Sequence, residues 1–296
     1  MTNPKKRPPW LLLPLGLLFL AGLSLLLYPL FSARWNQRRS DALIRDYERQ
    51  FTAPDAESSA AANHARWFDL ADAYNATLPG KGVPDAFSKI TPEEDRNYLA
   101  QLSFSADGVM GFISIPRISV SLPIYHTTSE AVLQKGVGHL QGSALPVGGE
   151  STHCVLSAHR GLPSAALFTD LNLLGPGDHF YLHVLDRVLA YEVDQVLEVE
   201  PSDTANLDVI PGADLVTLVT CTPYGVNTHR LLVRGHRVEY TVETVQTERE
   251  TAVSSVHTRY ELWVAAGLGF TALLALILWR VSRRGGKRLE KKGRRH

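Results

Sequence analysis

Short hydrophobic runs, separated by Gly, Pro and Asp, dominate residues 110–240 and predict β-strands. Asp186 and Arg187 form a plausible hairpin turn between two of these runs, while residues 129–135 and 163–174 are candidate short helices. Because strands outnumber helices and do not alternate with them, the pattern favours a closed β-barrel and a mainly β fold. The runs expected to form strands are GFISI, ISVSLPIY, HCVLSA, HFYLHVL, VLAYEV, LVTLVT and RLLVRGHRVEY.

Helical periodicity precedes these strands, in residues 32–105. Residues 41–51 and 56–78 carry apolar side chains at helical spacing. The sequence TPEE at residues 91–94 predicts the start of a third helix, because it combines a capping box with proline in the first turn. Residues 79–90 form a predicted loop ahead of that helix.

Two longer apolar segments lie near the ends of the chain. Residues 10–31 form a leucine-rich run without charge, and residues 261–279 form a second run with Glu261 at its margin. Each is about long enough to cross the ~30 Å hydrocarbon core of a bilayer as a helix. The first run could instead be a secretory signal peptide, but it is long for one, and Phe31 occupies a position where cleavage favours a small residue.

The formal net charge of zero conceals a strong asymmetry. Residues 1–39 hold six Lys or Arg and no acid, and residues 280–296 hold nine Lys or Arg and one acid; 15 of the 30 basic and 29 of the 30 acidic residues therefore lie between them. A basic excess confined to the ends, beside membrane segments, argues against a nucleic-acid-binding protein. Since Lys and Arg favour the cytoplasmic side, we expect both termini inside and the acidic domain outside the cell.

These segments predict the order of domains along the chain. A polar linker rich in Thr, Glu and Ser separates the predicted barrel from the second apolar run. The expected parts are a cytoplasmic N-terminus (1–9), a transmembrane helix (10–31), a helical region (32–105) with a loop at about 79–90, a barrel (106–240), a linker (241–260), a second transmembrane helix (261–281) and a cytoplasmic tail (282–296).

Residues 217–237, TLVTCTPYGVNTHRLLVRGHR, carry the strongest chemical signal. One apolar run ends on Cys221, a Pro/Gly/Asn-rich loop follows, and Arg230 begins the next run. If the runs are antiparallel neighbours, a thiol and a guanidinium meet at one end of the sheet. A cysteine is nucleophilic as its thiolate, and a nearby positive charge lowers its pKa. The guanidinium could also donate hydrogen bonds to an oxyanion, although a surface arginine would show the same spacing.

A thiolate nucleophile needs a proton partner, most often histidine, and the chain contains eleven histidines. His159 is the strongest candidate because it follows a buried-looking strand in a Gly/Pro-containing loop, VLSAHRGLP, and such loops commonly carry catalytic groups. Taken alone, the segment also fits a solvent-facing loop histidine. The competitors are His229, which adjoins Arg230, and more weakly His126, His139 and His153.

Cys154 lies in the strand-like run THCVLSA and is interpreted as a small buried hydrophobic residue, not as a disulfide partner of Cys221. His153 and His159 could join a cysteine to ligate zinc, but neither His-Glu-x-x-His nor Cys-x-x-Cys spacing is present. The sequence also lacks a Gly-rich phosphate loop and a Gly-x-Ser-x-Gly motif. We therefore predict no metal and no cofactor.

Several motifs resemble the class C sortases of Gram-positive bacteria, the pilin polymerases. The segment around Cys221 is joined by LPIYHTTSE, GVGHLQGSALPVGG and THCVLSAHRGLP, and the resemblance covers about residues 110–240 with weaker similarity back to Tyr74. Carried over by motif, it implies Cys221 as nucleophile, His159 as acid/base and Arg230 as the third catalytic residue. It also implies an eight-stranded sortase β-barrel with additional N-terminal helices.

The resemblance further implies a reaction and its partners. Members of this family cut an LPXTG-type sorting signal between Thr and Gly and hold the Thr carbonyl as a thioester. In class C enzymes a lysine amine of another pilin subunit resolves it, leaving an isopeptide bond. The expected partners are therefore pilin subunits that carry such a signal and an acceptor lysine.

Class C sortases also share a lid loop with Asp-Pro-Phe or Asp-Pro-Trp, whose Asp contacts the catalytic Arg and whose aromatic ring covers the Cys. The matching residues here are Asp85, Ala86 and Phe87. Alanine in place of the central proline removes a restriction on the backbone, which bears on the stiffness of the lid more than on its existence.

Three other functions compete with pilin polymerisation. A housekeeping-type sortase would pass proteins to a cell-wall amine, and an exported thiol protease would use water as acceptor. A membrane-anchored binding barrel without catalysis would have no need for Cys, His and Arg at strand ends. The two apolar segments together with Asp85 and Phe87 favour the pilin-polymerising enzyme.

Overall fold

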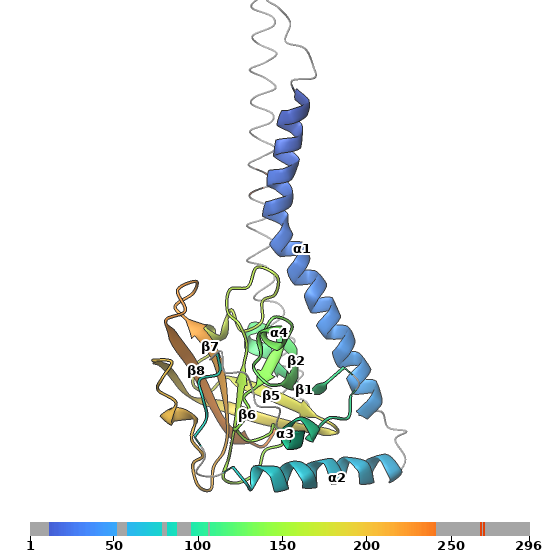
Figure 1. Ribbon diagram of the computed structural model, residues 1–296, viewed down its shortest axis with the longest axis vertical. Coiled ribbons are helices and arrows are strands. Elements are labelled where there is room, and N and C mark those ends of the chain that lie inside the picture. Colours follow the sequence, from blue (N-terminus) through green and yellow to red (C-terminus); the bar gives the residue numbers. More distant parts are fainter. Residues whose placement is uncertain are drawn as a thin grey trace, which may run out of the picture. The chain divides into compact units, whose positions relative to one another are not determined.

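The computed structural model describes residues 12–51, 58–78, 82–87, 96–105 and 107–240, together with Gly267 and Gly269. Its centre is a closed barrel of eight strands in the order β1-β2-β3-β4-β7-β8-β6-β5 (Figure 1), which confirms the predicted barrel. The strands are β1 (Val109–Ile115), β2 (Val120–His126), β3 (Val137–His139), β4 (Thr152–Ser157), β5 (His179–Val184), β6 (Arg187–Val199), β7 (Asp214–Thr222) and β8 (His229–Val238).

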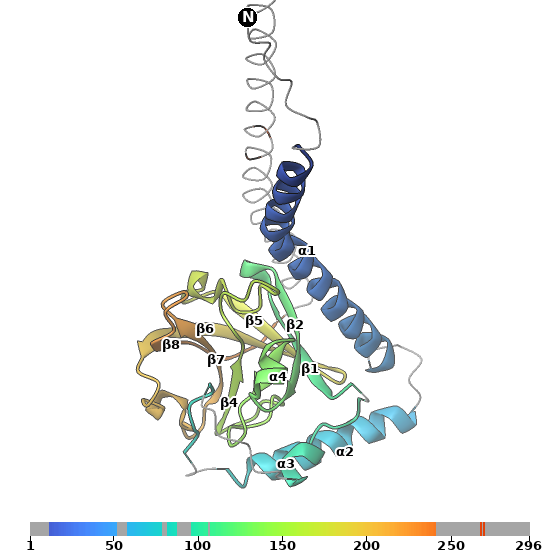
Figure 2. The same ribbon diagram turned by 45° about the horizontal axis from the view of Figure 1, so that its top comes forward.

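Two long helices precede the barrel and flank it on adjacent sides (Figures 1 and 2). A single helix, α1, joins the apolar run at 10–31 to the charged helix expected at 41–51. Within the part of the chain that the structure describes, no helix is both long and apolar enough to cross a membrane. The helices are α1 (Leu12–Phe51), α2 (Ser58–Asn75), α3 (Arg96–Ala100) and α4 (Glu130–Leu133), with 3-10 turns η2 (Pro116–Ile118), η3 (Leu171–Leu173) and η4 (Ala205–Leu207).

Several predicted segments fall outside the described residues. These are the N-terminus at 1–9, the helix start at 91–94, the linker at 241–260, the C-terminal tail at 282–296 and, apart from Gly267 and Gly269, the apolar segment at 261–281. Of the predicted loop at 79–90, residues 82–87 are described.

The strands predicted from the hydrophobic pattern are present, but three local predictions are wrong. The pattern missed β3, which is only three residues long and has Gly138 at its centre, so it shows no alternation. The β5–β6 turn lies at Leu185 and Asp186, one residue earlier than expected, because Leu185 adopts the positive φ of 53° that closes it. Residues 163–174 contain only the short 3-10 turn η3, whereas the helix expected within 129–135 is present as α4.

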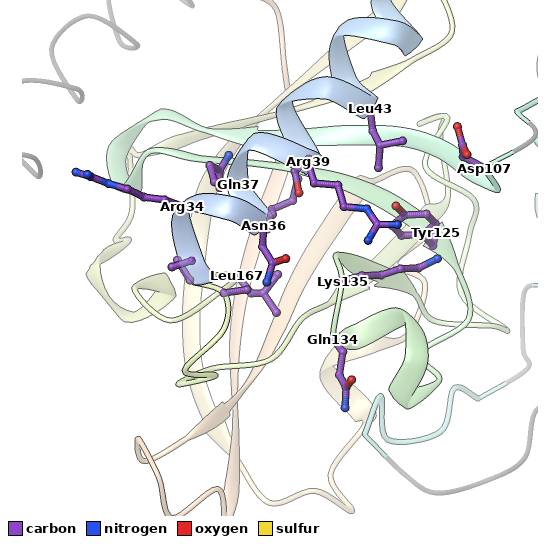
Figure 3. Close-up of a pocket in the computed structure, with 15 residues that line it drawn as sticks. Arg34, Asn36, Gln37, Arg39, Leu43, Asp107, Tyr125, Gln134, Lys135 and Leu167 are labelled. Carbon is purple, nitrogen blue, oxygen red and sulfur yellow. The ribbon is translucent and has the colours of Figure 1, made fainter. Parts of the chain in front are cut away.

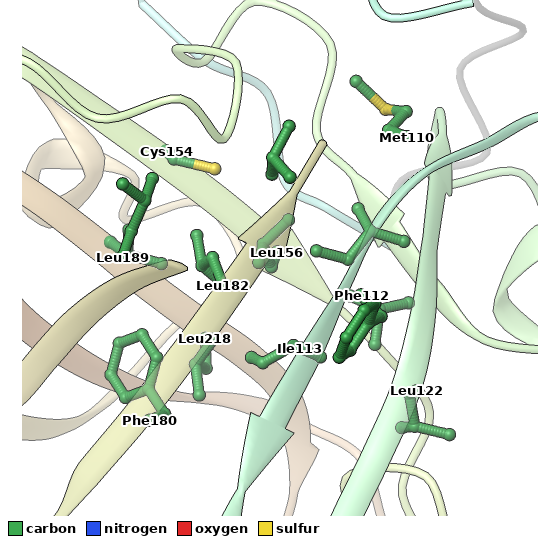
Figure 4. Close-up of a cluster of buried hydrophobic side chains, with 14 of the residues drawn as sticks. Met110, Phe112, Ile113, Leu122, Cys154, Leu156, Phe180, Leu182, Leu189 and Leu218 are labelled. Carbon is green, nitrogen blue, oxygen red and sulfur yellow. The ribbon is translucent and has the colours of Figure 1, made fainter. Parts of the chain in front are cut away.

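Inward-facing side chains of the strands form the main core of the barrel (Figure 4). Ile113, Leu156, Leu182 and Leu218 are fully buried, whereas the neighbouring Phe112 points to the outer face of β1 and packs against Tyr47 of α1. Burying side chains of this size contributes about 1.5–3 kcal/mol each to folding, and non-local pairing of the strands fixes where they meet.

The position of β7 explains why its sequence is uncharged and largely apolar after Asp214. It pairs in parallel with β4 and antiparallel with β8, so strands flank it on both edges. All of its residues after Asp214 are buried. A strand covered on both faces has no need for polar alternation.

The N-terminal helices are fastened to the barrel by specific contacts. The buried Tyr47 hydroxyl of α1 donates to the Met110 carbonyl at 3.3 Å and accepts from the Leu185 amide at 2.6 Å. In α2, the Asn75 side chain accepts from the Leu145 amide at 2.8 Å, linking the helix to the loop after β3. The helices are thus part of the same packed unit as the barrel.

We expect Gly235→Ala to destabilise the barrel. A Cβ at this position of β8 would lie 2.7 Å and 2.9 Å from two ring atoms of Phe180, and Phe180 is fully buried against Tyr191. Overpacking of this kind costs about 1–3 kcal/mol, which thermal unfolding should report as a Tm lower by about 3 °C per kcal/mol. Gly175→Ala is the matched control, because nothing lies within 4 Å of its Cβ position; equal effects would contradict the packing argument.

Candidate active site

Cys221 and Arg230 face each other at the end of two neighbouring strands. They form a register pair of the antiparallel strands β7 and β8, and Arg230 Nη1 lies 3.7 Å from Cys221 Sγ. The eight-residue connection between them is short enough to return the chain directly, as the sequence pattern indicated. The structure therefore confirms that the thiol and the guanidinium meet at one end of the sheet.

His159 reaches the same end of the barrel from β4. Strand β4 runs parallel to β7, with Ser157 opposite Val219, so the residues two positions further along both strands emerge together. The pairing continues past β4, because the Ala158 amide donates to the Val219 carbonyl at 3.2 Å. The His159 Nε2 atom lies 3.5 Å from Glu130 Oε1 of α4.

Residues 82–87 pack against this end of the barrel. Asp85 binds the Arg230 guanidinium through both carboxylate oxygens, at 2.8 Å to Nε and 2.7 Å to Nη2. The two side chains are only 16% and 12% exposed. Phe87 lies between the cation and the imidazole, with its ring centre 5.1 Å from the guanidinium carbon of Arg230 and 5.7 Å from the ring centre of His159.

Residues 82–87 are also held by apolar contacts with the barrel. Ala86 is 1% exposed and Val83 is 8% exposed. They belong to a small apolar cluster, separate from the main core, whose other buried members come from the barrel and its loops: Leu140, Val155, Leu207, Val219 and Leu232. Ala86 thus occupies the position of the expected proline as a tightly packed residue, and Cys221 is left 9% exposed.

Burial dominates the ionisation of the thiol in this arrangement. Desolvation raises the pKa of Cys221 above its usual value of 9.0, Arg230 opposes the rise, and the Asp85 carboxylate adds to it. The sequence predicted that Arg230 lowers the pKa of Cys221. Arg230 does act in that direction, but burial outweighs it and the net pKa is raised. With residues 82–87 in place the thiol is protonated at neutral pH.

This shift predicts how alkylation of Cys221 depends on pH. Because the raised pKa keeps the thiolate scarce, the iodoacetamide rate of the full chain should still be rising at pH 9. The measurement is best made with a Cys154→Ala chain, so that one thiol reports. A rate that levels off below about pH 8 would contradict the dominance of burial, since the rate follows the thiolate fraction.

The four competing histidines make other contacts. His229 lies 3.2 Å from Glu200, on the strand position before Arg230. His126 and His153 bind backbone carbonyls, those of Gln101 and Asp208, at 2.7 Å and 2.8 Å. His139 is fully buried, and burial lowers its pKa to about 4. These contacts account for them as structural or surface residues and leave His159 as the histidine beside Phe87.

Two residues near the site were not singled out from the sequence. Arg160 bridges the strand ends, because its guanidinium donates to Thr222 Oγ1 at 3.3 Å and to Asn172 Oδ1 at 2.7 Å. Glu130 is the carboxylate next to His159. Adjacency to His159 was an available signal for Arg160, whereas nothing in the local sequence distinguishes Glu130 from other exposed acids.

Both cysteines are free thiols. Cys154 is 3% exposed inside the barrel, in agreement with its interpretation as a buried hydrophobic residue. Among the described residues, no group of three or more His, Cys, Asp or Glu is arranged to hold a metal ion. The chemistry that the site supports is that of a thiol, an imidazole and a guanidinium.

Comparisons with a family model, with sequence relatives and with solved structures all point to the same protein family. The sortase-domain family model matches residues 113–238. Sortase A of Bacillus anthracis is 31% identical over 146 residues, which cover 49% of this chain and 68% of the relative. The crystal structure of sortase C-1 from Actinomyces oris is 47% identical with a TM-score of 0.57, covering 60% of this chain and 99% of that one.

A second solved structure, sortase C from Streptococcus pneumoniae, is 43% identical with a TM-score of 0.62 and covers 68% of this chain and 98% of that one. Both solved relatives are thus matched over nearly their whole length. The chain belongs to the sortase family of cysteine transpeptidases, and its solved relatives place it with the class C sortases.

Proposed function

We propose that this sortase cleaves an LPXTG-type sorting signal between Thr and Gly and transfers the acyl group to a lysine amine of another pilin subunit. The observation that carries the proposal is the convergence of Cys221, Arg230 and His159 beneath residues 82–87. The similar sortase C of Streptococcus pneumoniae is described as having pilin substrate specificity, which supports the same substrate class here.

In the proposed reaction His159 takes the proton of the Cys221 thiol once residues 82–87 have moved away, and the resulting thiolate attacks the carbonyl carbon of the Thr–Gly peptide bond. Arg230 donates hydrogen bonds to the oxygen that gains negative charge, and such donors matter most in the transition state. His159 gives a proton to the departing Gly amine. The result is a thioester between the Thr carbonyl and Cys221.

Resolution of the thioester reverses these roles. A neutral lysine amine attacks the thioester carbonyl, and His159 accepts the proton that the amine loses. The C–S bond breaks, Cys221 leaves as thiolate, and an isopeptide bond remains. Water attacking in place of the amine would release a free carboxylate and waste the intermediate, so shielding from solvent favours transfer.

Residues 82–87 act as a lid in this proposal. While Asp85 binds Arg230 through both oxygens, that guanidinium face is occupied. Val83 and Ala86 also cover an apolar surface that includes Leu207 and Val219, a surface suited to the Leu-Pro part of a sorting signal. Substrate binding therefore requires the lid to move away, which exposes the thiol and removes the Asp85 carboxylate from it.

The proposed location is the outer face of the cell membrane, with the catalytic domain outside and both termini inside. The support comes from the charge-free run at 10–31, the apolar run at 261–281 and the basic tail. Sorting-signal precursors would then be held at the same surface as the enzyme.

The function is tested by co-expressing the full chain with a candidate pilin that carries an LPXTG-type signal. We expect SDS-resistant ladders with the unmodified chain and with Cys154→Ala, the matched cysteine control, and none with Cys221→Ala. Ladders that persist with Cys221→Ala would contradict a mechanism in which Cys221 is the nucleophile. Anchored monomers without ladders would favour the housekeeping role, and a cleaved free carboxylate would favour a thiol protease.

A further inference from the structure

A cavity of about 440 Å³ lies between α1 and the barrel (Figure 3). Residues 33–43 of α1 form one wall, and residues of β2, of the chain after α4 and of the loop at 165–167 form the others. None of Cys221, His159 and Arg230 lines it. The cavity is therefore a feature of the helix–barrel junction rather than part of the candidate active site.

The lining of this cavity is strongly cationic. It includes Arg34, Arg39 and Lys135 against a single carboxylate, Asp107. Figure 3 shows Arg39 and Lys135 both reaching toward Tyr125, and the Lys135 ammonium lies 4.0 Å from the centre of that ring. Among the ion pairs formed between described residues, none involves these three cations.

Arg39 and Lys135 converge beside Tyr125, whereas Arg34 points away from them (Figure 3). Like charges that are brought together repel one another, so a bound anion would stabilise this arrangement. Tyr125, a buried residue of the same lining, carries a neutral hydroxyl donor beside these cations. An anion with several acceptor oxygens, such as a phosphate group, would satisfy this set of donors.

A second cavity adjoins the first, and its lining favours a ligand that has an apolar part as well as an anionic one. It shares Arg34 and Asn36 with the first and is otherwise lined largely by α1 residues that include Tyr28, Phe31 and Trp35. These three side chains are 59%, 70% and 72% exposed, and their spacing of three and four residues puts them on one helix face. A cationic site thus continues into an exposed apolar and aromatic surface.

The position along α1 favours a lipid over a soluble anion. At about 1.5 Å per residue, Arg34 lies about 4.5 Å and Arg39 about 12 Å beyond Phe31, the last residue of the charge-free run. The headgroup layer is about 5–8 Å thick on each side of a bilayer. Helical side chains lean toward the helix N-terminus, so Arg39 reaches back toward that layer.

We propose that the cavity binds the phosphate of an anionic membrane lipid, with an acyl chain lying along Tyr28, Phe31 and Trp35. The inference rests on the proposed membrane location and not on the proposed reaction. It assigns Arg34, Arg39 and Lys135 to lipid recognition, a role separate from that of Arg230.

Native mass spectrometry of the full chain in detergent tests this assignment. Phosphatidylglycerol and phosphatidylcholine with the same acyl chains are titrated, with glycerol 3-phosphate and inorganic phosphate as soluble arms. We expect phosphatidylglycerol to bind about tenfold more tightly than each of the other three probes, a difference of about 1.4 kcal/mol. Arg39→Gln with Lys135→Gln should reduce this preference to about twofold or less.

Arg45→Gln with Arg66→Gln is the matched control, since both are exposed helix arginines that line neither cavity. It should keep the full preference. The single variants Arg39→Gln and Lys135→Gln, checked by thermal unfolding, keep the test decisive if the double variant does not fold. Equal binding of the two lipids, a double variant that keeps the preference, or soluble phosphate binding as tightly as the lipid would each overturn the proposal. The same measurement on Cys221→Ala separates it from any failure of the proposed reaction.

Discussion

Asp85→Ala should raise the rate at which iodoacetamide labels Cys221 by about 10- to 100-fold. Charge-assisted hydrogen bonds contribute about 1.5–3 kcal/mol, and each 1.4 kcal/mol is a factor of ten in the population of the open lid. Removal of the carboxylate also removes one of the causes that raise the pKa of Cys221. Both effects act in the same direction.

The control for this prediction is Asp194→Ala. Asp194 binds Arg234 through both oxygens, at 3.0 Å and 2.9 Å, in a pair of the same chemistry between β6 and β8. It should leave the labelling rate within about twofold of the unmodified chain, since Asp194 pairs with Arg234 and not with Arg230. Phe87→Ala should also accelerate labelling. Unchanged labelling rates for both Asp85→Ala and Phe87→Ala would show that residues 82–87 do not restrict access to Cys221.

Arg230→Lys should change labelling and ligation in opposite directions. Lysine keeps the charge but cannot bind Asp85 through two parallel hydrogen bonds, so the lid loosens and we expect labelling to rise about tenfold. Ligation of a sorting-signal peptide to an amine should nevertheless fall about 10²- to 10³-fold, the loss typical of a missing oxyanion donor. Unfolding would also expose the thiol and abolish ligation, so an unchanged Tm of the variant is required to attribute the two effects to the site itself.

Arg234→Lys serves as the paired control, because Arg234 lies on the same strand and also binds an aspartate through two hydrogen bonds. It should leave both rates nearly unchanged. If Arg230→Lys ligates within about twofold of the unmodified chain, Arg230 has no role in stabilising the transition state. If it slows labelling, the Asp85–Arg230 pair does not hold the lid.

Local sequence signals were sufficient for the β7–β8 end of the site. A strand covered on both sides leaves a charge-free, largely apolar run, and the short connection from Cys221 to Arg230 brings the ends of the two strands together. His159 was found for a related reason, since it directly follows the neighbouring β4. Strand ends are thus readable from sequence when the strands are long and their connections short.

Features made by distant contacts were not readable in the same way. Asp85 and Arg230 are 145 residues apart, and only the resemblance to class C sortases connected them. The cavity at the helix–barrel junction joins Arg39 to Lys135, and neither residue has a local pattern that points to the other. The net rise in the pKa of Cys221 likewise depends on its burial in the folded protein, which outweighs the cation that the sequence placed beside it.

The central claim is that Cys221 carries the acyl group during transfer, and intact-mass spectrometry tests it most directly. The full chain with Asp85→Ala is incubated with an LPXTG-type peptide and then mapped with trypsin, which isolates residues 188–230. The account predicts an added mass equal to the peptide up to its Thr, located on Cys221 and released by hydroxylamine. Peptide cleavage without this adduct, or an adduct that persists in a Cys221→Ala chain, would contradict it.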